Sequence, residues 1–218
     1  MTEWANWSLS FGRLGRRMPR AFAQSEKDDI RDALLRVGLA AFERLGVRAA
    51  RVEDICREVG IAKGSFYAFF PSKEELFMAI VEEREALHYA DMMGYLAGPA
   101  RKAADRAAGF FDMIVAKMET DPVLELILRS GEIPHLIRKL GPERFAQGQA
   151  RDEAFAEAAA RAWTARDGTA IVAGDLLGLM TIILSLASQR KYMTQAQYRP
   201  AMALMRELFV VRLVGETP

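Results

Sequence analysis

Apolar residues recur along this chain at spacings of three and four, which is the pattern of helices that bury one face. The pattern holds from Ser25 to Gly46, with Ser25 as the helix cap and Gly46 as the stop. Val52, Ile55 and Val59 repeat it over a shorter segment. Helical periodicity continues through the rest of the chain and predicts an all-α protein.

A helix-turn-helix unit is predicted between Val52 and Pro71. Gly60 ends the first short helix, and Pro71 closes the second because its ring cannot continue a helix. Two short helices joined by a tight turn are typical of this unit. Its second helix lies in the major groove of DNA, with its N-terminal residues nearest the bases. We therefore expect DNA contacts from the start of that helix, at Ala62, Lys63, Gly64 and Ser65.

Two further residues suit the phosphate backbone. Tyr67 is expected to point outward, with a hydroxyl that can bond a phosphate oxygen. Lys73 lies in the first turn of the next helix, where its ammonium and the N-terminal amides of the helix both favour a phosphate. That long helix begins after Ser72, which forms a capping box with Glu75.

The run from Ala33 to Ile80, which includes AAFERLG, KGSFY and FPSKEEL, resembles the DNA-binding domain of the TetR family of one-component regulators. The resemblance implies an all-helical homodimer. Each subunit would have an N-terminal three-helix helix-turn-helix domain and a C-terminal helical domain for ligand binding and dimerisation. It further implies a transcriptional regulator, by family habit a repressor, that binds a palindromic DNA operator and is released by a small-molecule effector.

One position departs from the family pattern. Where members usually have Thr or Ser as the N-cap of the second helix, this chain has Arg51. An arginine does not cap a helix in the same way, so we expect a weaker cap and a direct contact between Arg51 and a phosphate. The remaining positions match the family, which implies base contacts from Lys63, Gly64 and Ser65 and phosphate contacts from Tyr67 and Lys73.

The pattern divides the chain into four segments. Residues 1–24 form a basic tail that we expect to be flexible, and residues 25–72 form the DNA-binding domain. Residues 73–98 form a connecting helix, and residues 99–218 form the ligand-binding and dimerisation domain. Two interpretations of the tail stay open: an arm that reaches along the DNA backbone or into the minor groove, and a poorly ordered terminus.

The last two helices predict a dimer interface. Between residues 167 and 190, small residues share one face while large apolar residues occupy the others. The final helix, from Ala196, has two adjoining apolar stripes, which is more than one subunit needs. A four-helix interface with two helices from each subunit would bury the excess. We expect it to include Gly174, Gly178, Thr181, Ser185, Ser188, Met202, Met205 and Phe209.

Apolar and aromatic residues of the body are candidates for an effector pocket. Taken singly, each is more typical of plain core, but together they favour a hydrophobic or aromatic small molecule. A polar contact would come from His135 or Thr181. The candidate ligand-binding residues are Phe110, Ile114, Met118, Leu128, His135, Trp163, Met180 and Leu184.

Catalysis and metal binding are not predicted. The chain has two histidines and one cysteine, too few for a histidine-cysteine metal cluster. It also lacks the GxSxG nucleophile elbow and a phosphate-binding loop. We therefore expect neither enzyme activity nor a cofactor. A single cysteine and the lack of an export or membrane signal favour a cytoplasmic protein.

Net charge gives the DNA prediction little general support. It is +1 at pH 7, and residues 25–71 contain equal numbers of basic and acidic side chains, whereas nucleic-acid binders usually have a basic patch. Recognition would therefore depend on a few placed charges. The alternative function is a helical regulator or adaptor controlled by a protein partner rather than a small ligand. A closed apolar pocket between the body helices would favour the ligand.

Overall fold

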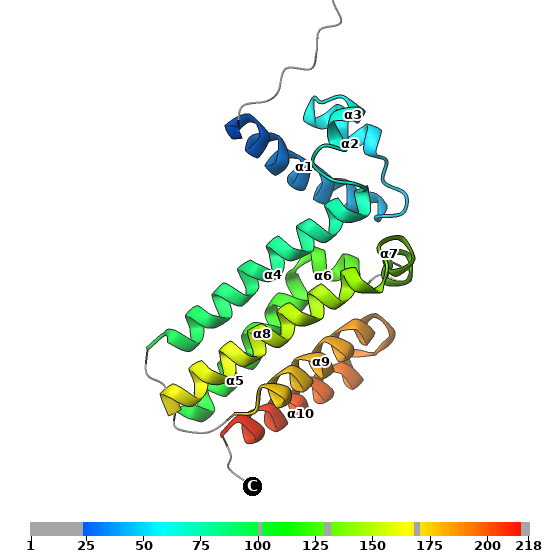
Figure 1. The fold of residues 1–218 in the computed structure, drawn as a ribbon. Helices are drawn as coiled ribbons and strands as arrows, with labels where there is room; N and C mark the ends of the chain where they lie inside the picture. The colour runs from blue at the N-terminus through cyan, green and yellow to red at the C-terminus, as the bar shows by residue number, and fades with distance from the viewer. Residues whose placement is uncertain (1–23, 100–101, 129–131, 168–170, 215–218) are drawn as a thin grey trace, which may run out of the picture.

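The computed structural model describes residues 24–99, 102–128, 132–167 and 171–214, and within these ranges every regular element is a helix. The helices form an N-terminal head and a larger body, joined by one long helix (Figure 1). The predicted all-α architecture is confirmed. No helix in the described ranges is long and apolar enough to cross a membrane.

The head consists of α1 (Gln24–Leu45), α2 (Val52–Val59) and α3 (Lys63–Phe66). Each helix turns its apolar stripe inward, and Phe42 and Phe66 are fully buried at the centre. α3 is shorter than its sequence pattern indicates, because a turn replaces the regular helix after Phe66. The predicted tail, residues 1–24, lies outside the described residues except for its last position.

Glycines set the two reversals of the head. Gly46 and Gly60 have φ angles of 77° and 83°, in the left-handed region that residues with a Cβ rarely adopt. After α2, the backbone N–H groups of Gly60 and Ile61 both donate to the carbonyl oxygen of Cys56, at 2.9 and 3.0 Å. These bonds end the helix and fix the direction in which the chain enters α3.

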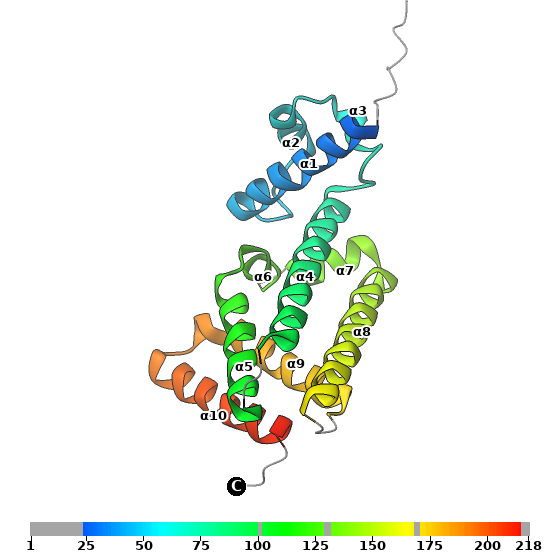
Figure 2. The ribbon, with the colours of Figure 1, turned by 90° about the vertical axis from the view of Figure 1, so that its left-hand side faces the viewer.

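One long helix, α4 (Lys73–Ala97), leads from the head along the body. Its predicted capping box is confirmed on the N-cap side, since the hydroxyl of Ser72 accepts the backbone N–H of Glu75 at 3.1 Å. Figure 2 shows α4 between two body helices, α5 (Ala103–Thr120) and α8 (Pro142–Asp167). α4 therefore packs against the body along its length and joins it directly to the head.

The body surrounds a second apolar cluster. Its remaining elements are α6 (Pro122–Ile127), α7 (Glu132–Leu140), α9 (Ala173–Gln189), the 3₁₀ turn η1 (Arg190–Tyr192) and α10 (Gln195–Val214). Phe110 is central, with its ring centroid 5.9 Å from Trp163 and 6.3 Å from Phe209. α10 packs along α5, and α9 packs along α8 (Figure 1).

The short helices α6 and α7 connect the body to the head. Val123 and Leu126 of α6 and Leu136 of α7 are at most 2% exposed and belong to the same apolar cluster as the side chains of α1 and α4. The head core therefore extends across the boundary expected from the sequence at residues 98 and 99. The head rests on α6 and α7 as well as on α4.

Candidate nucleic-acid interface and effector region

The N-terminal end of α3 faces away from the core of the head. Ala62, Lys63 and Gly64 are exposed, and Ser65 is half-buried. Ala62 is the N-cap, has an extended backbone and makes no side-chain cap. The next apolar residue, Phe66, is fully buried and anchors the helix. The predicted base-contacting residues therefore lie together on an accessible surface, as a groove-reading helix requires.

Two features of α3 and the turn after it keep this surface open. A Cβ added at Gly64 would meet no described atom within 4 Å. Tyr67 is 50% exposed, and its ring lies edge-on to Phe66 at a centroid distance of 5.4 Å. Phe66 thus orients the Tyr67 ring while leaving half of it accessible.

Lys63 is paired with a residue that the sequence analysis did not select. Its Nζ lies 2.6 Å from Oε1 of Glu53, in the first turn of α2. The hydrogen bond from Lys63 lowers the pKa of Glu53, and the same bond raises the pKa of Lys63. Glu53 and Lys63 are ten positions apart on different helices, so helical periodicity contains no signal for this pair.

Lys73 is engaged within the head. Its Nζ donates to the carbonyl oxygens of Arg48 and Ala50, at 2.7 and 2.8 Å, and so closes the loop between α1 and α2. An ammonium group has three N–H donors, which leaves one for the predicted phosphate contact. Arg51 is exposed and extended, and its side chain makes no cap hydrogen bond to α2; its contact with a phosphate stays a prediction.

The predicted ligand-binding residues do not form one group. Phe110, Ile114 and Trp163 are together in the body cluster, at most 1% exposed, and Met180 packs against that cluster. The indole N–H of Trp163 is buried without a hydrogen-bond partner among the described residues. Such a donor is costly to leave unpaired. Leu184 is half-buried on α9.

Two of the predicted residues line a separate cleft. Met118 and Leu128 face η1 across an open hollow of about 440 Å³, whose walls include Glu119, Arg190 and Lys191. Arg190 is 3.3 Å from Glu119, so the charged wall is itself paired. The cleft is amphipathic and borders the aromatic cluster, against which Met118 packs.

The predicted dimer residues fall on two different sides of their helices. On α9 the small residues lie outward: Gly174, Gly178, Thr181 and Ser185 are exposed, and Ser188 is half-buried. On α10, two of the predicted interface residues face the core of their own subunit. Met202 and Phe209 are 8% and 0% exposed within one subunit, because that stripe packs on α5. Met205 is half-buried. The outward apolar residues are instead Leu204 and Leu208, at 57% and 51%.

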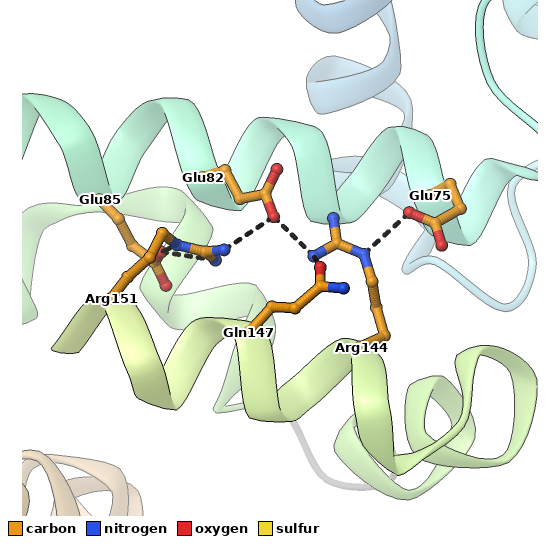
Figure 3. A network of polar contacts seen from close by, with 6 residues as sticks. All are labelled: Glu75, Glu82, Glu85, Arg144, Gln147 and Arg151. Carbon is orange, nitrogen blue, oxygen red and sulfur yellow. Dashed lines mark hydrogen bonds and ion pairs between the residues drawn. The ribbon is translucent and has the colours of Figure 1, made fainter. Parts of the chain in front are cut away.

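A ladder of ion pairs joins α4 to α8 (Figure 3). Arg144 lies between Glu75 and Glu82, at 3.0 and 2.6 Å, and Arg151 lies between Glu82 and Glu85, at 3.1 Å from each. The five side chains are partly buried. Burial raises the pKa of Glu85 despite its bond to Arg151. The ladder fixes the part of α4 that is nearest the head.

Both histidines of the chain also connect to α4. His88 of α4 lies 2.9 Å from Asp121, the N-cap of α6, and Arg84 lies 3.2 Å from the same carboxylate. Burial is the main cause of a lowered pKa at His88. His135, predicted as a ligand contact, instead bonds Glu74 at 3.0 Å, between α7 and the first turn of α4. Within the described ranges, no cluster of His, Cys, Asp and Glu could hold a metal ion.

At the level of sequence, the head is the part of the chain that is similar to known proteins. Residues 34–80 fit a family model described as bacterial regulatory proteins, tetR family. Over 86 residues the chain is 28% identical to the nucleoid occlusion factor SlmA of Actinobacillus pleuropneumoniae, an alignment that covers 39% of each protein. The corresponding factor of Haemophilus ducreyi is 29% identical over 69 residues, 32% of this chain and 33% of that protein. The chain thus spans only about two-fifths or less of the length of these relatives.

Solved structures match nearly the whole described fold. A transcriptional regulator of the TetR/AcrR family from Thermobifida fusca superposes with a TM-score of 0.59 at 18% identity, covering 84% of this chain and 97% of that one. A transcriptional regulator from Saccharomonospora viridis in complex with choline gives 0.59 at 16% identity, covering 84% and 94%. The fatty acid degradation regulator FadR from Bacillus halodurans gives 0.57 at 12% identity, covering 83% and 94%. At these identities the likeness is one of fold.

Proposed function

This chain has the TetR-family fold and carries the family's N-terminal domain, and on that premise we propose that it is a ligand-responsive, sequence-specific repressor that binds a palindromic operator as a homodimer. The proposal includes a cytoplasmic location, where the operator DNA would be. It assigns no catalytic activity and no cofactor to the protein.

The observation that carries the proposal is the outward N-terminus of α3. Exposed Ala62, Lys63 and Gly64 are set beside fully buried Phe66, so the helix is held firmly while its reading end is accessible. A single head with equal numbers of acidic and basic side chains would bind weakly. Two heads on a two-fold axis would read half-sites about 34–36 Å apart, or a multiple of that distance.

A second copy of the chain is the partner that best fits the outer face of α9 and α10. Ile182 of α9 and Leu204 and Leu208 of α10 are each at least 50% exposed, and the small residues Gly174 and Gly178 of α9 are exposed as well. Exposed apolar side chains that adjoin a surface of low relief favour close helix packing. We therefore propose that Leu204 and Leu208, and not Met202 and Phe209, belong to the dimer interface.

The effector we propose is a small hydrophobic or aromatic molecule with a hydrogen-bond acceptor. The indole N–H of Trp163, which has no hydrogen-bond partner in the part of the chain that the structure describes, lies in a cluster with Phe110 and Phe209 and supports this class. Entry would require the cluster to open, which would displace α8 and the ladder that joins it to α4. A ligand that prefers the displaced arrangement lowers the affinity of the protein for DNA. By linkage, bound DNA lowers the affinity of the protein for the ligand by the same factor.

Selection of random duplexes by the purified protein tests this function. Sequencing of the retained DNA at moderate salt should reveal a palindrome with a fixed half-site spacing. The enriched duplex then serves as a fluorescent probe to screen aromatic and aliphatic small molecules for release. Absence of any enriched sequence would overturn the proposed function.

A second candidate function is a helical regulator or adaptor controlled by a protein partner. It is favoured by two apolar side chains of α7, Ile133 and Ile137, which lie one turn apart and are 38% and 43% exposed. Under this alternative the enriched duplex would be released by no small molecule. Substitution of Ile137 by Asp would then abolish the response to the partner without changing DNA affinity.

A further inference from the structure

Three of the cations around the helix-turn-helix unit are engaged within the protein. Lys63 is paired with Glu53 at 2.6 Å, and Arg57 is paired with Asp54 at 2.8 Å. Lys73 donates to two backbone carbonyl oxygens. Binding of proteins to DNA of any sequence depends on cations that are free to neutralise phosphates. These three cations are therefore less available to neutralise phosphates, which weakens binding to DNA of unrelated sequence.

The Lys63–Glu53 pair differs from the contacts of Arg57 and Lys73 in its location. Lys63 begins α3 and Glu53 lies in the first turn of α2, so the pair bridges the two helices at the end of α3 that would face the bases. The two side chains are 51% and 52% exposed. The ammonium is thus held at the reading surface, whereas the Arg57–Asp54 pair lies along α2.

A lysine held in this way has a restricted choice of DNA partners. Its four-carbon stem normally samples many rotamers, and the bond to Glu53 selects those that keep the ammonium at the start of α3. One N–H donor goes to the carboxylate and two are left, enough for O6 and N7 of a guanine. If Lys63 moved to a phosphate instead, it would leave the Glu53 carboxylate unpaired beside a negatively charged backbone.

We propose that Glu53 is a specificity-determining residue, which positions Lys63 for base contact and suppresses binding to DNA of unrelated sequence. This inference rests on the proposed function. Glu53 acts through Lys63 and touches no base itself. The same arrangement suits a DNA-binding head without a net positive charge, because sequence preference would come from the bases that Lys63 reaches.

The test compares two duplexes, the enriched palindrome and a shuffled version of the same composition. Binding of each to wild type and Glu53→Gln is measured by fluorescence anisotropy at several salt concentrations. We expect the ratio of the two affinities to fall about tenfold in Glu53→Gln. Binding of the shuffled duplex should also become more salt-dependent, with a slope of log K against log salt that is steeper by about 0.9 for each additional phosphate that the variant neutralises.

Glu58→Gln is the matched control, since it removes the same charge from an exposed position on the same helix. It should leave the ratio within about twofold of wild type. In a Lys63→Met background, Glu53→Gln should change the ratio no more than the control does, because its effect requires the lysine. Equal effects of Glu53→Gln and Glu58→Gln, or an undiminished effect without Lys63, would overturn the inference. A wild-type protein that does not distinguish the duplexes would instead overturn the proposed function itself.

Discussion

Substitution of Gly64 by Ala is expected to change DNA contact and folding stability in opposite directions. Gly64 lies within α3, its φ is not in the left-handed region, and an added Cβ would meet no described atom within 4 Å. Alanine is favoured over glycine in a helix by about 0.5–1 kcal/mol. The free energy of unfolding should therefore rise by up to that amount, with no packing penalty.

DNA binding should change in the opposite direction. If the start of α3 lies against the base edges, the new methyl group occupies the space through which the backbone approaches DNA. Loss of one well-made base contact costs about 1–3 kcal/mol, and a dimer carries the change in both half-sites. We expect affinity for the enriched duplex to fall at least about tenfold, which corresponds to about 1.4 kcal/mol.

Urea unfolding followed by circular dichroism and fluorescence anisotropy on the enriched duplex measure the two effects. Gly94→Ala is the control, since Gly94 lies on α4 and an added Cβ there also meets no described atom within 4 Å. It should raise stability similarly and leave DNA affinity unchanged. A stable Gly64→Ala protein with undiminished affinity would refute the placement of α3 in the groove. Lower stability would show that this face of α3 is not open.

Three further predictions concern the rest of the molecule. Lys73→Met should lower the free energy of unfolding by about 1–3 kcal/mol, because two carbonyl oxygens lose a charged donor; unchanged urea midpoints would contradict this role. Gly178→Leu should give a folded monomer by analytical ultracentrifugation, since an added Cβ meets no described atom of the subunit; a variant that stays dimeric would exclude the small-residue interface. The lowered pKa of His88 means that the folded protein takes up this proton less readily than the unfolded chain. Stability should therefore fall as pH decreases from about 7 to about 5, and the fall should be smaller in His88→Gln.

Local signals were sufficient for the architecture of the head. The three-and-four spacing of apolar residues, the stops at Gly46 and Gly60, and the cap formed by Ser72 and Glu75 each act within a few residues. The glycines are required because the chain reverses through left-handed backbone at both positions. Such features can be recognised in the sequence, and the head has the predicted order of helices.

Choices between faces and partners depended on the tertiary structure. The sequence of α10 has two adjoining apolar stripes, and only its packing on α5 buries Met202 and Phe209 while leaving Leu204 and Leu208 exposed. His135 has the polar aromatic side chain expected of a pocket residue, but the position of α7 places it within hydrogen-bond distance of Glu74. Periodicity assigns a residue to a face; it does not say which neighbour covers that face.

The sequence by itself determined that this protein is helical, where Gly46 and Gly60 end the first two helices, and which residues start α3. The tertiary structure alone decided what the two lysines that begin α3 and α4 contact: Lys63 pairs with Glu53, and Lys73 donates to the loop before α2. The physical reason is range. Helix formation and capping are set by groups a few residues apart, whereas an ion pair between two helices exists only once their packing has fixed the distance between them.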